Sequence, residues 1–198
     1  MVGNMRLHVH KKGLRVLGIA ESFRKGEGKK SVLSGVVMRG DLQIDGFALT
    51  TITVGGMDAT EGVLRLFHDL KREDINLILL NGCVIAWFNI IDLREIFRQL
   101  KIPLICVTYE ESEGLEKYFK DYFEDSDERI RLYKSLGARI PLTLYTGHEV
   151  LVRFFGIEEE REVKAILDRF TIQGAVPEPL KLARLLARAA LDWQRLII

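Results

Sequence analysis

The chain has 198 residues, of which 29 are basic and 28 acidic, so its formal charge is +1. A hydrophobic fraction of 47% and a charged fraction of 29% are typical of a globular chain with a sizeable core, which excludes disordered and fibrous proteins. The near-neutral charge excludes a strongly basic protein that coats nucleic acid, and the length favours a single domain over residues 1–198.

The first part of the chain predicts three strands. Residues 15–22 form an apolar run typical of a buried strand, and a basic loop follows at residues 24–30. Residues 31–39 are β-branched and apolar, and a Gly-Asp turn leads into residues 42–54, with Gly46 as a possible bulge. This order predicts an antiparallel meander.

The pattern then alternates between helices and strands. Asp58 to Glu61 has the form of a capping box before a helix, and residues 75–80 and 103–107 are short apolar strands around a second helix. A meander followed by right-handed crossovers predicts an α/β fold with a five-stranded mixed sheet, order 3-2-1-4-5, and flanking helices. Further helices near residues 115–122 and 127–136, a sixth strand near residues 141–145 and a C-terminal helical extension are expected to follow.

Cysteines and long apolar stretches exclude further classes. Cys83 and Cys106 each lie in an apolar run, as reduced packing residues do, and no Cys/His cluster has zinc-ligand spacing. The longest uncharged stretch, residues 75–91, contains three asparagines and is a poor membrane span. Because no apolar signal region follows the basic residues near the N-terminus, we expect a cytoplasmic protein with no membrane partner.

The predicted topology locates one site. The carboxyl ends of neighbouring parallel strands meet at one edge of an open sheet, where binding sites form. If the crossovers place the 75–80 strand beside the first strand, Ala20-Glu21-Ser22 faces Asn81-Gly82 across that edge.

At these positions the chain resembles the ribonuclease H-like fold and, within it, endonuclease V. It is also similar to an archaeal family of uncharacterised endonuclease V relatives, domain of unknown function ninety-nine. The motifs that carry the two resemblances are Gly18–Ser22, Leu80–Gly82, Gly147-His148, Gly56–Thr60, Ala86–Asp92 and, most specifically, Pro177–Ala183.

The resemblance implies nucleic-acid cleavage near a deaminated base, with Mg²⁺ or Mn²⁺ held by carboxylates. This sequence departs from that pattern: Ala20 and Asn81 stand where the nuclease has aspartates, and Arg184 stands where it has a histidine. The aromatic wedge of the nuclease falls at Thr53–Gly56, which contains no aromatic residue. We therefore expect a degraded metal site without a cofactor, at which nucleic acid or a nucleotide-like ligand binds.

Two sets of side chains are candidates for this function. The catalytic candidates are Glu21, Asp58 and Asn81, and Glu21 and Glu61 are the metal ligands if activity survives. The alternatives are a neutralised strand-end acid for Glu21, helix capping for Asp58 and Glu61, and a turn for Asn81. The candidates for phosphate contact, which could equally form a solvated surface, are Arg24, Lys29, Lys30, Lys181, Arg184 and Arg188.

Two other functions remain open. A site rearranged around Glu21, Asp58 or Glu61, and Asn81 predicts an active metal-dependent endonuclease. Residues 110–128 contain nine acidic residues against two basic ones, which is typical of a solvated helix but is also consistent with a protein-interaction surface. Trp87 and Phe88 either pack in the core or line a pocket at the sheet edge.

Overall fold

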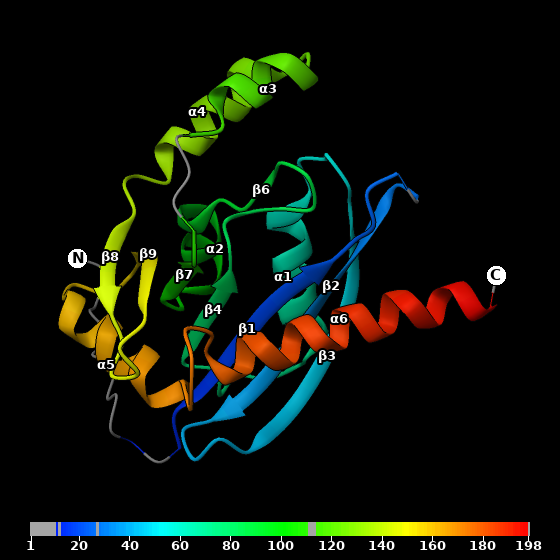
Figure 1. Cartoon of the computed structure of the whole chain (residues 1–198). Coiled ribbons are helices and arrows are strands. Elements are labelled where there is room, and N and C mark those ends of the chain that lie inside the picture. Colours follow the sequence, from blue (N-terminus) through cyan, green and yellow to red (C-terminus); the bar gives the residue numbers. More distant parts are fainter. Residues whose placement is uncertain (1–10, 12, 27, 111–113, 198) are drawn as a thin grey trace.

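The computed structural model describes residues 11, 13–26, 28–110 and 114–197. Within these residues, seven strands form one mixed sheet in the order β3-β2-β1-β4-β7-β9-β8 (Figure 1). β1 (Arg15–Ser22), β2 (Lys30–Arg39) and β3 (Ile44–Thr53) are antiparallel neighbours, which confirms the predicted meander. The register shifts where β2 pairs with the start of β3, next to Gly46, so a bulge lies beside the predicted position.

The second half of the sheet extends beyond the prediction. β4 (Leu77–Asn81) is parallel to β1, and β7 (Leu104–Thr108) is parallel to β4, so the predicted order of the first five strands is confirmed. The count of five was wrong, because β9 (Glu149–Phe155) and β8 (Ile140–Thr143) continue the sheet as antiparallel strands. Only the β8 region was expected from the sequence, since Arg153 interrupts the apolar pattern of β9.

Helices cover both faces of this sheet. α1 (Ala59–Asp69) and α2 (Leu93–Leu100) pack in one core with Leu17 and Ile19 of β1. α5 (Glu160–Phe170) and the start of α6 (Glu178–Ile197) pack in the other core with Val16. Successive β1 side chains therefore serve opposite cores, as the two-residue period of a strand requires. No helix in the described part of the chain is long and apolar enough to cross a membrane.

α6 lies across β1 and β2 in close contact (Figure 1). A Cβ on Gly18 would lie 2.6 Å from the carbonyl carbon of Pro179, so only glycine permits this approach. Ala20 is buried with Val36 against Ala183 of α6. Small residues on β1 therefore bring the first turns of α6 directly onto the end of the strand.

A pair of short helices projects above the sheet. α3 (Glu116–Tyr122) and α4 (Ser126–Ser135) lie beside each other at the top of Figure 1. Below them, β5 (Val84–Ile85) and β6 (Asn89–Ile90) form a small hairpin, and α4 contacts β6. The acidic segment of the sequence thus lies mainly on this projecting pair, with residues 111–113 outside the described residues.

Two local expectations were wrong. Asp58 makes no side-chain cap on α1; the amide oxygen of Asn89 accepts from the Ala59 N–H instead, because Asp58 is directed at the end of β3. Cys83 and Cys106 form a disulfide rather than remaining reduced. Their Cα atoms lie 6.1 Å apart, within disulfide range, because the turn at Gly82 brings Cys83 back beside β7.

Candidate functional site

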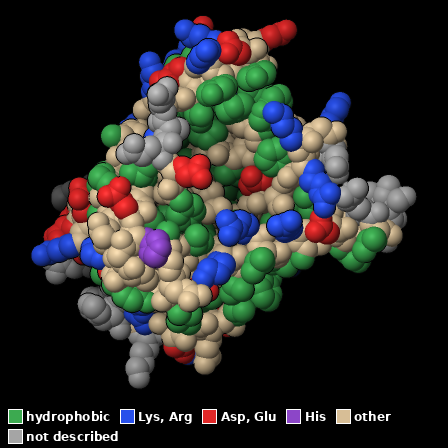
Figure 2. All heavy atoms as spheres, in the orientation of Figure 1, with side chains coloured by type: hydrophobic (Ala, Val, Ile, Leu, Met, Phe, Trp, Pro, Cys, Tyr) green, Lys and Arg blue, Asp and Glu red, His purple; other side chains and the backbone are tan. Residues whose placement is uncertain are grey.

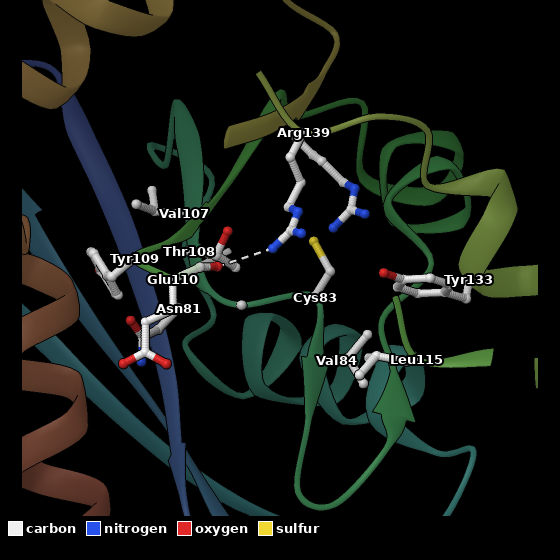
Figure 3. Close-up of a pocket in the computed structure, with 12 residues that line it drawn as sticks. Asn81, Cys83, Val84, Val107, Thr108, Tyr109, Glu110, Leu115, Tyr133 and Arg139 are labelled. Carbon is white, nitrogen blue, oxygen red and sulfur yellow. Dashed lines mark hydrogen bonds between the residues drawn. The ribbon is translucent and has the colours of Figure 1, made fainter. Parts of the chain in front are cut away.

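The parallel strands β1, β4 and β7 end at one edge of the sheet, as the topology predicts. A pocket of about 370 Å³ opens there, lined by residues that follow β4 and β7 together with residues near α4, β8 and β9 (Figure 3). Its walls include Asn81, Tyr109, Tyr133, Arg139 and Arg153. The edge is therefore hollow beside β4 and β7.

Two arginines give this pocket a positive wall. Arg139 Nη1 donates to the carbonyl oxygen of Glu110 at 3.1 Å, the hydrogen bond drawn in Figure 3. Arg153 Nε donates to the carbonyl oxygen of Gly137 at 2.9 Å, and its guanidinium carbon lies 5.6 Å from the centre of the Tyr133 ring. Burial and then the neighbouring Arg139 charge lower the pKa of Arg153, against the opposing contact with Tyr133. An anionic group in the pocket would offset both charges.

Two buried polar atoms belong to the same edge. Asn81 Oδ1 and the Tyr109 hydroxyl have no hydrogen-bond partner among the described residues, although both residues line the pocket. Burial raises the pKa of Tyr109, and the Arg184 charge opposes that shift. A buried polar atom without a partner is costly, so a ligand that hydrogen-bonds to these two groups would be stabilised.

Glu21 faces the other side of β1 from Ala20. Its carboxylate accepts from Ser31 Oγ at 2.8 Å and from the Ala86 N–H at 3.3 Å. Burial raises the pKa of Glu21, and these two hydrogen bonds oppose the shift. The strand alternation that directs Ala20 at α6 thus directs Glu21 at the turn between β5 and β6.

Asp58 forms hydrogen bonds with the last residue of β3. Its carboxylate accepts from the Thr53 N–H and Oγ1 and from Asn89 Nδ2, at 2.7 to 3.1 Å. Burial acts to raise the pKa of Asp58, but the hydrogen bonds from Thr53 and Asn89 outweigh it and lower the pKa. Glu61 is exposed on α1. These contacts give Asp58 a structural role, and its predicted catalytic role remains a prediction.

The basic candidates divide into paired and exposed groups. Arg24 forms an ion pair with Asp192 at 2.6 Å, Lys181 pairs with Glu178 at 2.5 Å, and Lys30 donates to Thr53 Oγ1 at 3.1 Å. Lys29, on the loop before β2, and Arg184 and Arg188, on α6, are exposed. Figure 2 shows Lys and Arg side chains over α6 bordering a hollow, with hydrophobic side chains near α3 across from them.

The residues present do not fit the metal centre that the endonuclease V resemblance implies. Ala20 is 3% exposed and packed against α6, which leaves no room for a ligand, and Asn81 offers only a neutral oxygen. Across the described ranges, no group of three or more His, Cys, Asp or Glu residues could hold a metal ion. Mg²⁺ in proteins usually needs carboxylates. The pocket lining contains one acidic residue, Glu110, beside the two arginines Arg139 and Arg153.

Sequence reasoning missed part of the site. The pocket arginines Arg139 and Arg153 were not candidates, because β9 was not predicted and so nothing placed residue 153 beside β7. Tyr109 comes directly after β7, and the rule that sites form at the carboxyl ends of parallel strands could have identified it.

Comparison with known proteins identifies relatives across nearly the whole chain. The family model described as "Endonuclease dU" matches residues 12–191. A UPF0215 protein of Pyrobaculum calidifontis is 35% identical over 180 residues, which cover 89% of this chain and 97% of the relative. A UPF0215 protein of Methanosarcina barkeri is 34% identical over 191 residues, 93% of each chain.

Solved structures share the fold. A protein of unknown function from Archaeoglobus fulgidus superimposes with a TM-score of 0.75 at 25% identity, over 89% of this chain and 98% of that one. Human ENDOV gives a TM-score of 0.61 at 15% identity, over 92% of this chain and 86% of that one. Ciona intestinalis endonuclease V, solved with a 24mer DNA containing an inosine, gives a TM-score of 0.59 at 17% identity. The match covers 91% of this chain and 87% of that one. The predicted resemblance to endonuclease V is confirmed at the level of the fold.

Proposed function

The chain belongs to the Endonuclease dU family, and on that premise we propose that it binds nucleic acid at the edge where β1, β4 and β7 end. Phosphates contact the exposed basic side chains of α6, and one nucleotide unit enters the pocket beside Asn81. This binding does not use a metal centre of the endonuclease V type, because Ala20 and Asn81 replace its aspartates.

The observation that carries the proposal is the pocket itself. It combines two arginines with the unpartnered polar atoms of Asn81 and Tyr109, and it adjoins the basic surface of α6. Guanidinium groups recognise phosphate, while an amide oxygen and a phenol hydroxyl suit the hydrogen-bonding edges of a base. The fold is shared with an endonuclease V that was solved with DNA, which supports nucleic acid as the class of ligand.

Labelled oligonucleotides test this proposal. Fluorescence anisotropy would measure binding of single-stranded, duplex, inosine-containing and dU-containing DNA at low and moderate salt. Arg184→Gln with Arg188→Gln should weaken binding, because each phosphate contact contributes through counterion release. Arg161→Gln removes an exposed charge from α5 and is the matched control, with no expected change. If none of the four probes shows salt-sensitive binding, the proposal is overturned.

Cleavage of the bound strand is a second candidate. Glu21 favours it, since this half-buried carboxylate with a raised pKa lies at the strand end of the site, and the family's name also points to an endonuclease. Incubation of each oligonucleotide with Mg²⁺ or Mn²⁺ should then yield products that Glu21→Gln abolishes. Product levels equal to those of a chelator control would exclude this candidate.

A further inference from the structure

Six aromatic rings gather beside the candidate site. This aromatic cluster joins the turn between β5 and β6 to α3 and consists of Trp87, Phe88, Tyr118, Phe119, Tyr122 and Phe123. The ring centre of Phe88 lies 5.9 Å from that of Tyr118 and 6.3 Å from that of Tyr122, with interplanar angles of 18° and 17°. The rings of Phe88, Tyr118 and Tyr122 are thus held nearly parallel. The Trp87 ring lies 5.6 Å from that of Tyr122 and is tilted by 53° to it.

The turn that carries Trp87 and Phe88 has an unusual backbone. Ala86, Trp87 and Phe88 have φ values of 42°, 57° and 72°, a left-handed conformation that residues other than glycine rarely adopt. Glu21 holds the start of this turn by accepting from the Ala86 N–H. Such a conformation persists only where surrounding contacts enforce it, and it is concentrated at binding sites.

A buried arginine fixes the cluster to the rest of the protein. Arg129 of α4 is 3% exposed and donates to the carbonyl oxygens of Gly55, Gly56 and Phe88 at 2.9 to 3.0 Å. Its guanidinium carbon lies 3.9 Å from the centre of the Phe123 ring. The cluster is therefore preorganised rather than loosely attached.

Part of this rigid cluster nevertheless faces solvent. Tyr118 is 47% exposed and Tyr122 is 57% exposed, while Phe119 beneath them is fully buried. In Figure 2 the hydrophobic side chains near α3 border the hollow, and Lys and Arg side chains of α6 border its other side. Packing of the core explains Phe119, but it does not explain two exposed tyrosines in a fixed, near-parallel arrangement.

We propose that Tyr118, Tyr122 and Trp87 form a stacking surface for unpaired bases of a single-stranded nucleic acid whose phosphates contact α6. The inference rests on the proposed function and names its substrate class. An aromatic platform beside a basic surface is the usual construction of sites for single strands, since every base has a face that can stack. Paired bases in a duplex present no free face to such rings.

The charges around the hollow favour this occupant over a basic protein. The acidic residues of α3 and α4 would attract a basic partner, but the Lys and Arg side chains over α6, on the other side of the hollow in Figure 2, would repel it. A single strand satisfies both sides, because its bases contact the rings and its phosphates contact the arginines. A Cβ on Gly55 would lie 3.1 Å from the Trp87 ring, so Trp87 lies directly against the loop that follows β3.

The test compares three labelled probes of equal length: a single strand, its duplex and an abasic single strand with the same phosphates. The wild-type protein should bind the single strand at least about tenfold more tightly than the abasic strand. Tyr118→Leu with Tyr122→Leu should remove most of that difference and leave abasic binding unchanged, whereas the Tyr→Phe pair should retain it. Tyr145→Leu, at a distant tyrosine that is 59% exposed, is the matched control.

Tryptophan fluorescence gives a second readout. The chain has two tryptophans, so Trp193→Phe leaves Trp87 as the sole indole. The single strand should quench this emission and the abasic strand should not. Circular dichroism of each variant separates misfolding from lost stacking. If the Leu pair does not fold, quenching of Trp87 in the Trp193→Phe protein still tests the inference.

The outcomes separate the inference from the proposed function. Equal affinity for base-containing and abasic strands, with salt-sensitive binding that depends on Arg184 and Arg188, would overturn the stacking surface and leave the proposed function standing. No binding of any probe would overturn both. If the Leu pair instead weakens binding of a polylysine peptide without affecting the single strand, the surface takes a basic protein and the inference is wrong.

Discussion

The two faces of β1 at its carboxyl end have opposite chemistry. On one face, Gly18 and Ala20 pack directly against α6 and present no polar side chain. On the other face, the Glu21 carboxylate binds Ser31 and the backbone of Ala86. The strand therefore ends with an acid that faces the aromatic turn and not the helix. Close packing fills the α6 face, while the opposite face carries the organised polar contacts.

The largest effect is expected on the polar face. Arg129→Gln removes donors from three carbonyl oxygens and a partner from Asp125, so the free energy of unfolding should fall by about 3 kcal/mol. Chemical denaturation would measure this change. Arg131→Gln, at an exposed position on the same helix, should change little. Equal stability of the two variants would mean that Arg129 does not organise the turn.

Overpacking of the α6 face should have the next largest effect. Gly18→Ala places a methyl group 2.6 Å from Pro179 and should lower the free energy of unfolding by about 1–3 kcal/mol. Gly13→Ala is the control, because a Cβ there meets no atom within 4 Å. If Gly18→Ala unfolds at the same denaturant concentration as the wild type, α6 is not held against β1 as closely as the structure indicates.

The smallest effect is the contribution of Glu21 to the pH dependence of stability. Burial raises its folded-state pKa, so its contribution to stability is fully present below pH 4.5, its ordinary pKa, and is lost as the pH rises through the raised value. Glu21→Gln imitates the protonated acid and should remove this loss. Relative to the Gln variant, the wild type should become less stable between pH 4.5 and neutrality, as measured by thermal unfolding. A difference that stays constant over this range would contradict the raised pKa.

Much of the central sheet could be predicted, because its strands carry clear patterns. The apolar runs of β1, β4 and β7 and the crossovers between them fix the parallel order and bring Glu21 and Asn81 to one edge. β9 was missed because it is a partly exposed strand with a charged residue in its centre. The disulfide was missed because pairing of Cys83 with Cys106 depends on strand register, which apolar composition does not reveal.

The sequence predicted the edge of the sheet at which the candidate site lies, but not the residues that line it. Strand alternation correctly separated Ala20 from Glu21, yet no local pattern shows that Trp87 lies against the loop at Gly55 or that Arg153 lies beside Tyr133. These contacts depend on a left-handed turn at non-glycine residues and on a strand added at the sheet edge. Sequence patterns favour neither feature, so only the tertiary structure reveals them.

The most direct test of the central claim is the salt dependence of single-strand affinity in the presence of a metal chelator. Binding should persist without divalent ions. Replacing both Arg184 and Arg188 with glutamine should reduce the slope of log affinity against log salt by about 0.7 per charge removed. Binding that disappears in chelator, or a slope unchanged by both substitutions, would contradict the claim.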